Sequence, residues 1–245
     1  MKDYLHLNGQ ILYWLLIGPW KKQPFKVGHI LNQLVRMGVE ALPMVALTAF
    51  SIGLTLAMQG AHELQRMGAA LYVPNLVSVS LLRELGPLLI AIIVIGRSGS
   101  AITAELGTMK VSEEIEALDV MAINPIRFLI VPRFVAMLIM LPVLTVFGNY
   151  IGMVGGWTIC HFALDMSTAA YVMRAIEAAK LGDLYSGLTK SVVFAWLVVT
   201  IASYAGLKVE GGAEGVGMAT THSVVYSILA ILVANAMLTA LFFFL

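Results

Sequence analysis

Four long stretches of the sequence contain no Asp, Glu, Lys or Arg: residues 41–61, 134–160, 191–207 and 223–245. An α-helix needs about 20 predominantly apolar residues to cross the hydrocarbon core of a bilayer, and each stretch is close to that length. The composition agrees, because 60% of the residues are hydrophobic and 12% are charged, against roughly 25% charged in an average soluble domain. The sequence therefore predicts an all-α integral membrane protein.

A fifth stretch is apolar enough to span a membrane but contains the charged pair Arg83 and Glu84. The charge-free part that follows this pair, residues 85–96, is too short to cross alone, so the pair must lie within the span. We therefore expect five transmembrane helices, at about residues 41–61, 75–104, 134–160, 189–207 and 223–245.

Residues 1–40 precede the first span and are expected to form cytoplasmic or interfacial helices. Trp14 and Trp20 suit the headgroup region of a bilayer. Lys and Arg are more numerous in residues 1–40 and 97–133 than in the other connections. The positive-inside rule then predicts a cytoplasmic N-terminus, and five spans leave Leu245 on the outer, periplasmic side.

Charge and motif counts exclude several other classes. The 15 Lys and Arg balance 14 Asp and Glu, and Cys160 is the single cysteine, which excludes a basic nucleic-acid-binding protein and a disulfide scaffold. The five histidines share no ligand spacing, so no metal site is expected. Gly212 and Gly217 have the spacing of a P-loop, but Met218 and Ala219 stand where its Lys and Ser/Thr belong. We expect no nucleotide site, no cofactor and no ATP hydrolysis in this chain.

The acidic residues concentrate in the connection between the second and third spans, in a segment predicted to be a short amphipathic helix over residues 112–122. Ser112 is its expected N-cap, and acidic side chains in a first turn are favoured by the helix dipole. Pro125 is expected to end it. A solvated connector and a docking helix for a cytoplasmic partner both fit this pattern. The residues concerned are Glu113, Glu114, Ile115, Glu116, Leu118 and Asp119.

Three segments resemble the MlaE-type permeases, the membrane subunits of ABC systems that move phospholipids between bacterial membranes. They are RELGPLL (83–89), GRSGSAITAELGTMKVSEEIEALDVMAINPIRFLIVPR (96–133) and GVGMATTHSVVYS (215–227). The resemblance runs from about Gly28 to the C-terminus, so it implies a permease domain over residues 41–245 in the inner membrane.

The resemblance also implies partners. In that family the acidic loop helix is a coupling helix that sits in a groove of the ATP-binding subunit. Its four acids would then face basic residues of the ATPase, with Ile115 and Leu118 as apolar anchors. An MCE-domain periplasmic protein and a small STAS-domain protein are the other partners implied, and the family forms homodimers around a lipid cavity.

Arg83 and Glu84 would lie close to the centre of the bilayer, where an ionisable side chain is by default a functional-site hypothesis. Pro87 is expected to bend the helix there, because it cannot donate to the carbonyl of Arg83. The resemblance places this position near the lipid cavity, whereas an ion pair with another helix is the structural alternative. Candidate apolar walls for the lipid are Leu76, Val77, Ser80, Leu81 and Leu88.

Gly148, Gly152 and Gly156 form a ladder of small residues on the third span. Such ladders let helix backbones approach closely. Packing within the chain and a seam between two copies are both compatible with this ladder.

The function expected is that of a homodimeric permease subunit in an ATP-driven phospholipid transporter that maintains the lipid asymmetry of the outer membrane. An ion-coupled secondary transporter would use Arg83 and Glu84 without an ATPase. A non-transporting membrane anchor would use the acidic helix alone.

Overall fold

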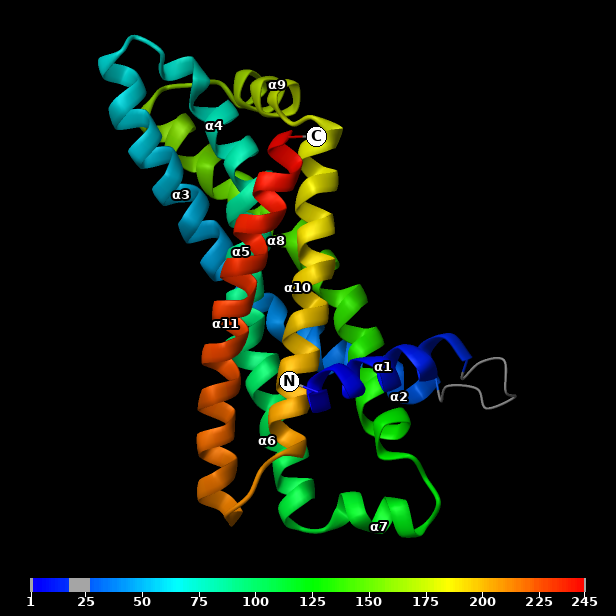
Figure 1. Cartoon of the computed structure of the whole chain (residues 1–245). Coiled ribbons are helices and arrows are strands. Elements are labelled where there is room, and N and C mark those ends of the chain that lie inside the picture. The colour runs from blue at the N-terminus through cyan, green and yellow to red at the C-terminus, as the bar shows by residue number, and fades with distance from the viewer. Residues whose placement is uncertain (1, 18–26, 245) are drawn as a thin grey trace. The chain divides into compact units, whose positions relative to one another are not determined.

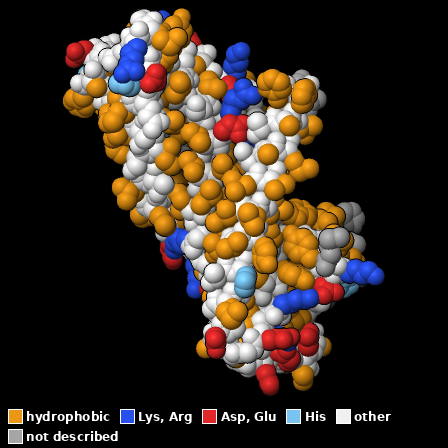
Figure 2. Space-filling model, turned by 60° about the vertical axis from the view of Figure 1, so that its left-hand side comes forward, with side chains coloured by type: hydrophobic (Ala, Val, Ile, Leu, Met, Phe, Trp, Pro, Cys, Tyr) orange, Lys and Arg blue, Asp and Glu red, His pale blue; other side chains and the backbone are white. Residues whose placement is uncertain are grey.

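The computed structural model describes residues 2–17 and 27–244, and these residues form helices and no strand (Figure 1). Among the described residues, five helical segments are long and apolar enough to cross a membrane, which confirms the all-α membrane fold. They are Gly28–Arg66, Ala70–Val111, Ile126–Ala163, Leu181–Leu207 and Gly212–Phe244. Hydrophobic side chains cover most of the face drawn in Figure 2, where charged side chains gather in a few clusters.

The helices have the following bounds: α1 Lys2–Ile17, α2 Val27–Met37, α3 Leu42–Arg66, α4 Val73–Ser80, α5 Gly86–Val94, α6 Ser100–Val111, α7 Glu114–Val120, α8 Val131–Ala163, α9 Thr168–Ala178, α10 Leu181–Leu207 and α11 Gly212–Phe244. Short 3₁₀ turns occupy Val39–Ala41 and Ala70–Tyr72. π-helical turns occupy Leu81–Leu85, Ile95–Gly99 and Ile126–Ile130. The second span is therefore continuous in the chain but interrupted twice by wider turns, which sequence periodicity does not reveal.

The chain divides into two compact units. Unit 1 contains the described residues of Met1–Ala41, Val94–Met140 and Val193–Met237, and unit 2 contains those of Leu42–Ile93, Leu141–Val192 and Leu238–Leu245. Helices α8, α10 and α11 each contribute residues to both units.

In unit 1, the N-terminal helix α1 is fastened to α10 by polar contacts. The Tyr4 hydroxyl lies 2.7 Å from Thr200 Oγ1, and Trp196 Nε1 donates to Asn8 Oδ1 at 3.0 Å. The Asp3 carboxylate pairs with Lys208 at 2.6 Å, and this ion pair lowers the pKa of Asp3. Trp20, which we expected beside the headgroups, lies outside the described residues.

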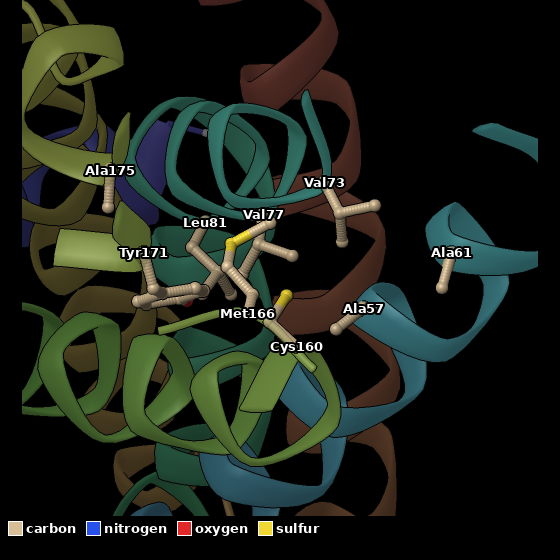
Figure 3. Packing of buried hydrophobic residues seen from close by; sticks show 9 residues of the cluster. All are labelled: Ala57, Ala61, Val73, Val77, Leu81, Cys160, Met166, Tyr171 and Ala175. Atoms are coloured by element: carbon tan, nitrogen blue, oxygen red, sulfur yellow. The ribbon is translucent and has the colours of Figure 1, made fainter. Parts of the chain in front are cut away.

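In unit 2, α3, α4, α8 and α9 share one hydrophobic core. Its side chains converge in Figure 3: Ala57, Ala61, Val73, Val77, Leu81, Cys160, Met166, Tyr171 and Ala175. The Tyr171 hydroxyl donates to the backbone oxygen of Met153 at 2.8 Å, so the one polar group of this aromatic side chain is satisfied.

The glycine ladder of α8 packs against helices of its own unit. A side chain on Gly148 would overlap Ile90, and one on Gly156 would come within 2.9 Å of Val77 and of the Tyr171 hydroxyl. A Cβ on Gly53 would overlap the backbone of Gly152. The ladder therefore holds α3, the second span and α8 in close contact.

One local expectation is wrong. Ser112 closes α6 instead of capping the next helix, because its amide and its Oγ both donate to the Thr108 carbonyl, at 2.9 Å and 3.0 Å. The chain turns at Glu113, where φ is 60°, and α7 then begins at Glu114. It ends at Val120, before Pro125. Gly212 and Gly217, which have the spacing of a P-loop, both lie in α11, which begins at Gly212.

Candidate functional site

Arg83 and Glu84 lie in the π-helical turn Leu81–Leu85, directly before Pro87 in the second span. Because Pro87 has no N–H, the carbonyl of Arg83 lacks the donor that a regular helix would supply. The Nζ atom of Lys190, on α10, donates to this carbonyl at 3.1 Å. A lysine from another helix thus replaces the hydrogen bond that proline removes.

The same ammonium group binds two further acceptors. Lys190 Nζ lies 2.7 Å from Glu84 Oε2 and 2.8 Å from Thr239 Oγ1, on α11. The Thr239 hydroxyl in turn donates to the Glu84 carboxylate at 3.1 Å. An ammonium has three donors, and Lys190 uses each on a different acceptor. We call Arg83, Glu84, Asp183, Lys190 and Thr239 the Lys190 cluster.

The sequence of α10 explains how Lys190 comes so close. Asp183, Gly187 and Lys190 recur at helical spacing and so share one face. A Cβ on Gly187 would overlap the backbone of Leu82, so only glycine allows α10 to approach the π-helical turn at this level. Asp183 Oδ1 lies 3.6 Å from Arg83 Nε. The Arg83 guanidinium therefore has an acidic partner on α10, as Glu84 has a basic one.

The burial of the charged side chains differs within the Lys190 cluster. The Lys190 side chain is fully buried, whereas those of Glu84 and Arg83 are 34% and 39% exposed. The ion pairs with α10 that we considered as the structural alternative are therefore present, and yet a carboxylate and a guanidinium also reach the surface of unit 2. A charged surface group within an apolar span can contact a ligand without losing its internal partner.

The expected apolar walls divide into two sets. Val77 and Leu81 are buried in the hydrophobic core of unit 2 (Figure 3), so they contact side chains of their own chain. Leu76 is exposed, and Ser80 and Leu88 are half-buried. Only the second set can contribute to a surface beside Arg83 and Glu84.

Helix α7 carries the acidic segment, and Figure 1 shows it as a short helix between the ends of α6 and α8. The side chains of Glu113, Glu114, Glu116 and Asp119 are exposed. Glu116 forms an ion pair with Lys110 of α6, which lowers the pKa of the Glu116 carboxyl. The Ser112 hydroxyl also donates to the Glu114 carboxylate at 3.0 Å, so two of the four exposed acids have a partner at the end of α6.

The two apolar residues expected to anchor a partner are instead buried. Ile115 is 7% exposed and Leu118 is 9% exposed, because the apolar stripe of α7 packs against its own unit. Val120 and Met121, 88% and 60% exposed, are the apolar side chains that α7 presents outward. A contact of Ile115 and Leu118 with a partner stays a prediction, and Val120 and Met121 are the more accessible apolar side chains.

The π-helical turn Ile126–Ile130, which leads into α8, begins with a side-chain cap. Asn124 Oδ1 accepts from the amide of Arg127 at 3.1 Å, and Pro125 follows at the first helical position, where its missing N–H costs nothing. The Arg127 guanidinium lies over the Trp14 ring at 5.4 Å from its centroid, which ties this connection to α1.

Sequence reasoning missed Asp183, Lys190 and Thr239. Lys190 lies at the start of the fourth expected span and directly precedes a charge-free stretch, but no role was assigned to it. The available signal was the spacing of Lys190, which follows Asp183 by seven residues and so shares a helix face with it. Among the described residues, no group of three or more His, Cys, Asp or Glu side chains could hold a metal ion.

Known proteins are similar to this chain over most of its length. The family model of the permease MlaE matches residues 30–241. A probable ABC transporter permease protein of Rickettsia typhi is 39% identical over 222 residues, which cover 91% of this chain and 86% of the relative. The intermembrane phospholipid transport system permease protein MlaE of Haemophilus influenzae is 36% identical over 242 residues, covering 96% and 90%. The chloroplastic protein trigalactosyldiacylglycerol 1 of Arabidopsis thaliana is 34% identical over 239 residues, covering 97% and 66%.

Proposed function

Because this chain belongs to the MlaE permease family of ABC transporters, we propose that it moves phospholipids between the inner and outer membranes of a bacterium. Transport of this kind would maintain the lipid asymmetry of the outer membrane. The chain would lie in the inner membrane with its N-terminus in the cytoplasm and its C-terminus in the periplasm.

The observation that carries this proposal is the Lys190 cluster. Transmembrane segments tolerate ionisable side chains where these pair with one another and serve a pathway. Here Lys190 is fully buried against Glu84, while Glu84 and Arg83 remain partly exposed. Such a site offers a phospholipid one positive and one negative group for its zwitterionic or anionic headgroup, beside the apolar side chains of Leu76 and Leu88.

The cavity itself would form between two copies of the chain. In the most apolar stretch of α11 only 11% of the residues are buried. Its exposed side chains include Leu229, Val233 and Met237, whose spacing places them along one side of the helix. A second copy would pack against this exposed side of α11, and the lipid cavity would lie between the two copies.

Energy would enter through α7. The chain has no P-loop lysine, so a partner ATPase would bind and hydrolyse ATP. The exposed acids of α7, with Val120 and Met121, would contact its basic groove. An MCE-domain protein on the periplasmic side would exchange lipid with the cavity, and a STAS-domain protein would bind the ATPase.

Lipid transfer in proteoliposomes that contain the chain and its ATPase tests this proposal. Glu84→Gln keeps the shape of the side chain but removes its charge, so we expect an at least tenfold slower ATP-dependent transfer, roughly the factor that one charge-assisted contact supplies. The matched control is Glu177→Gln on α9, where the side chain is exposed.

Three outcomes contradict the proposal. Transfer that continues after ATP is depleted would indicate an ion-coupled secondary transporter. Transfer that is unchanged in a Glu84→Ala, Arg83→Ala double variant would remove the lipid site. Absence of transfer in the wild-type assembly would favour a membrane anchor.

A further inference from the structure

A second group of charged side chains lies in unit 1, between α2, α6 and the start of α8. Three cavities of about 210, 260 and 400 Å³ adjoin one another there. The first two share Gln33, the first and third share Glu105, and the second and third share Arg133. They are therefore neighbouring cavities with common walls, which we call together the arginine groove and define by Gln33, Arg36, Glu40, Arg97, Glu105 and Arg133.

The arginine groove has an excess of positive charge at its centre. Glu105 binds two guanidinium groups, because its Oε1 lies 2.5 Å from Arg36 and its Oε2 lies 2.9 Å from Arg133. One carboxylate thus serves two arginines. Arg97 pairs with Glu40 at 2.7 Å, so the five charged residues retain a net charge of one positive unit.

Donor capacity also remains unused at this point. Arg133 is only 6% exposed, and its two terminal nitrogens are occupied by Glu105 and by the Leu129 carbonyl. Its Nε atom is buried and has no acceptor in the part of the chain that the structure describes. A buried donor without an acceptor costs free energy, and an external oxygen entering between α2 and α8 would supply one.

The side chains around the groove suit an amphiphilic ligand, because apolar and positively charged groups lie together. Apolar side chains line it together with the arginines, among them Met37, Ile102 and Phe128. On α2, the side chains of Leu31 and Val35 are about half exposed, and Val39 follows them at the same spacing. The short helix that carries Gln33 and Arg36 therefore also carries an exposed apolar stripe, on a different side from the groove-lining side chains.

We propose that the arginine groove binds a phosphate-bearing anion, with Arg36 and Arg133 as the residues that contact the phosphate oxygens. Guanidinium groups match phosphate in planar, bidentate geometry. The phosphate of a membrane lipid and free phosphate share this chemistry, and the apolar stripe of α2 favours the lipid. The site lies in unit 1, apart from the Lys190 cluster, and it does not depend on transport.

Native mass spectrometry of the purified full chain in mild detergent tests the proposal, with phosphatidylglycerol and phosphatidylcholine as probes. Arg36→Gln should weaken phosphatidylglycerol binding about tenfold, the loss expected for one charge-assisted hydrogen bond. The matched control is Arg66→Gln, at an exposed helical position of unit 2. Equal effects of the two variants, or equal affinity of the wild type for both lipids, would overturn the site.

A second variant gives a result of opposite sign. Glu105→Gln keeps the size of the side chain and an oxygen acceptor but removes the charge that competes for Arg36 and Arg133. Phosphatidylglycerol should therefore bind more tightly, by about tenfold on the same scale. Weaker binding in this variant would mean that Glu105 and the two arginines only hold the helices together, which contradicts the proposal.

Inorganic phosphate distinguishes the two sources of the anion. If millimolar phosphate displaces phosphatidylglycerol from the wild type but not from Arg36→Gln, free phosphate also occupies the site. If phosphate leaves the lipid bound, the lipid is the ligand. Loss of ATPase binding in Arg36→Gln with unchanged lipid binding would assign the groove to a protein partner and reject an anion site.

Discussion

The Lys190 cluster in unit 2 and the acidic helix α7 in unit 1 differ in what their charged side chains contact. Lys190 is fully buried and binds Glu84, Thr239 and the Arg83 carbonyl. On α7 the acids are exposed, and Glu116 has Lys110 as a partner. Charges within an apolar span must be satisfied inside the protein, whereas charges on an exposed helix remain available to a partner. Substitutions should therefore affect stability in the first region and assembly in the second.

The largest effect is expected at Lys190. Lys190→Met removes the positive charge that pairs with Glu84 and the N–H donor to the Arg83 carbonyl. Breaking a buried ion pair from one side costs about 3–5 kcal/mol, and we expect a loss of this size in the free energy of unfolding. Chemical denaturation in detergent measures it, with Lys180→Met as the control at an exposed position.

A double variant sharpens this test. Lys190→Met combined with Glu84→Gln removes both charges, so part of the lost stability should return. If Lys190→Met is as stable as Lys180→Met, the Lys190 cluster does not behave as a buried network, and the contrast with α7 fails.

The opposite pattern is expected on α7. Val120 and Met121 are 88% and 60% exposed, so replacing both by Ser should change the free energy of unfolding by less than about 0.5 kcal/mol. The same change should weaken co-purification of the ATPase by roughly tenfold or more, as the loss of apolar contacts in an interface does. Met67→Ser, at another exposed methionine, is the control. Undiminished co-purification would contradict the docking role of α7.

The contrast also marks what could be predicted from the sequence. The five spans followed from local scarcity of charge, and the amphipathic character of residues 112–122 followed from local spacing. The Lys190 cluster did not, because Glu84, Lys190 and Thr239 are far apart in the chain and meet only where Gly187 lets α10 approach Leu82. The side of α7 that faces its own unit was likewise undetermined, since an apolar stripe fits an internal contact and a partner equally well. Ser112 was misplaced because a serine that caps one helix and a serine that closes the previous one have the same local sequence.

The smallest effect is expected from pH and concerns the ion pair between Glu116 of α7 and Lys110 of α6. The ion pair with Lys110 lowers the pKa of Glu116 in the folded protein, so its contribution is complete above the ordinary Glu pKa of about 4.3 and is lost as pH falls through the lowered value. Carboxyl ¹³C NMR of the protein in detergent should give a titration midpoint for Glu116 below that ordinary value, and Lys110→Gln should return it toward about 4.3. Because both side chains are largely exposed, the unfolding midpoint at neutral pH should hardly change in this variant. A marked loss of stability in Lys110→Gln would mean that α7 depends on its charge pair as the Lys190 cluster does, and the distinction between the two regions would then not hold.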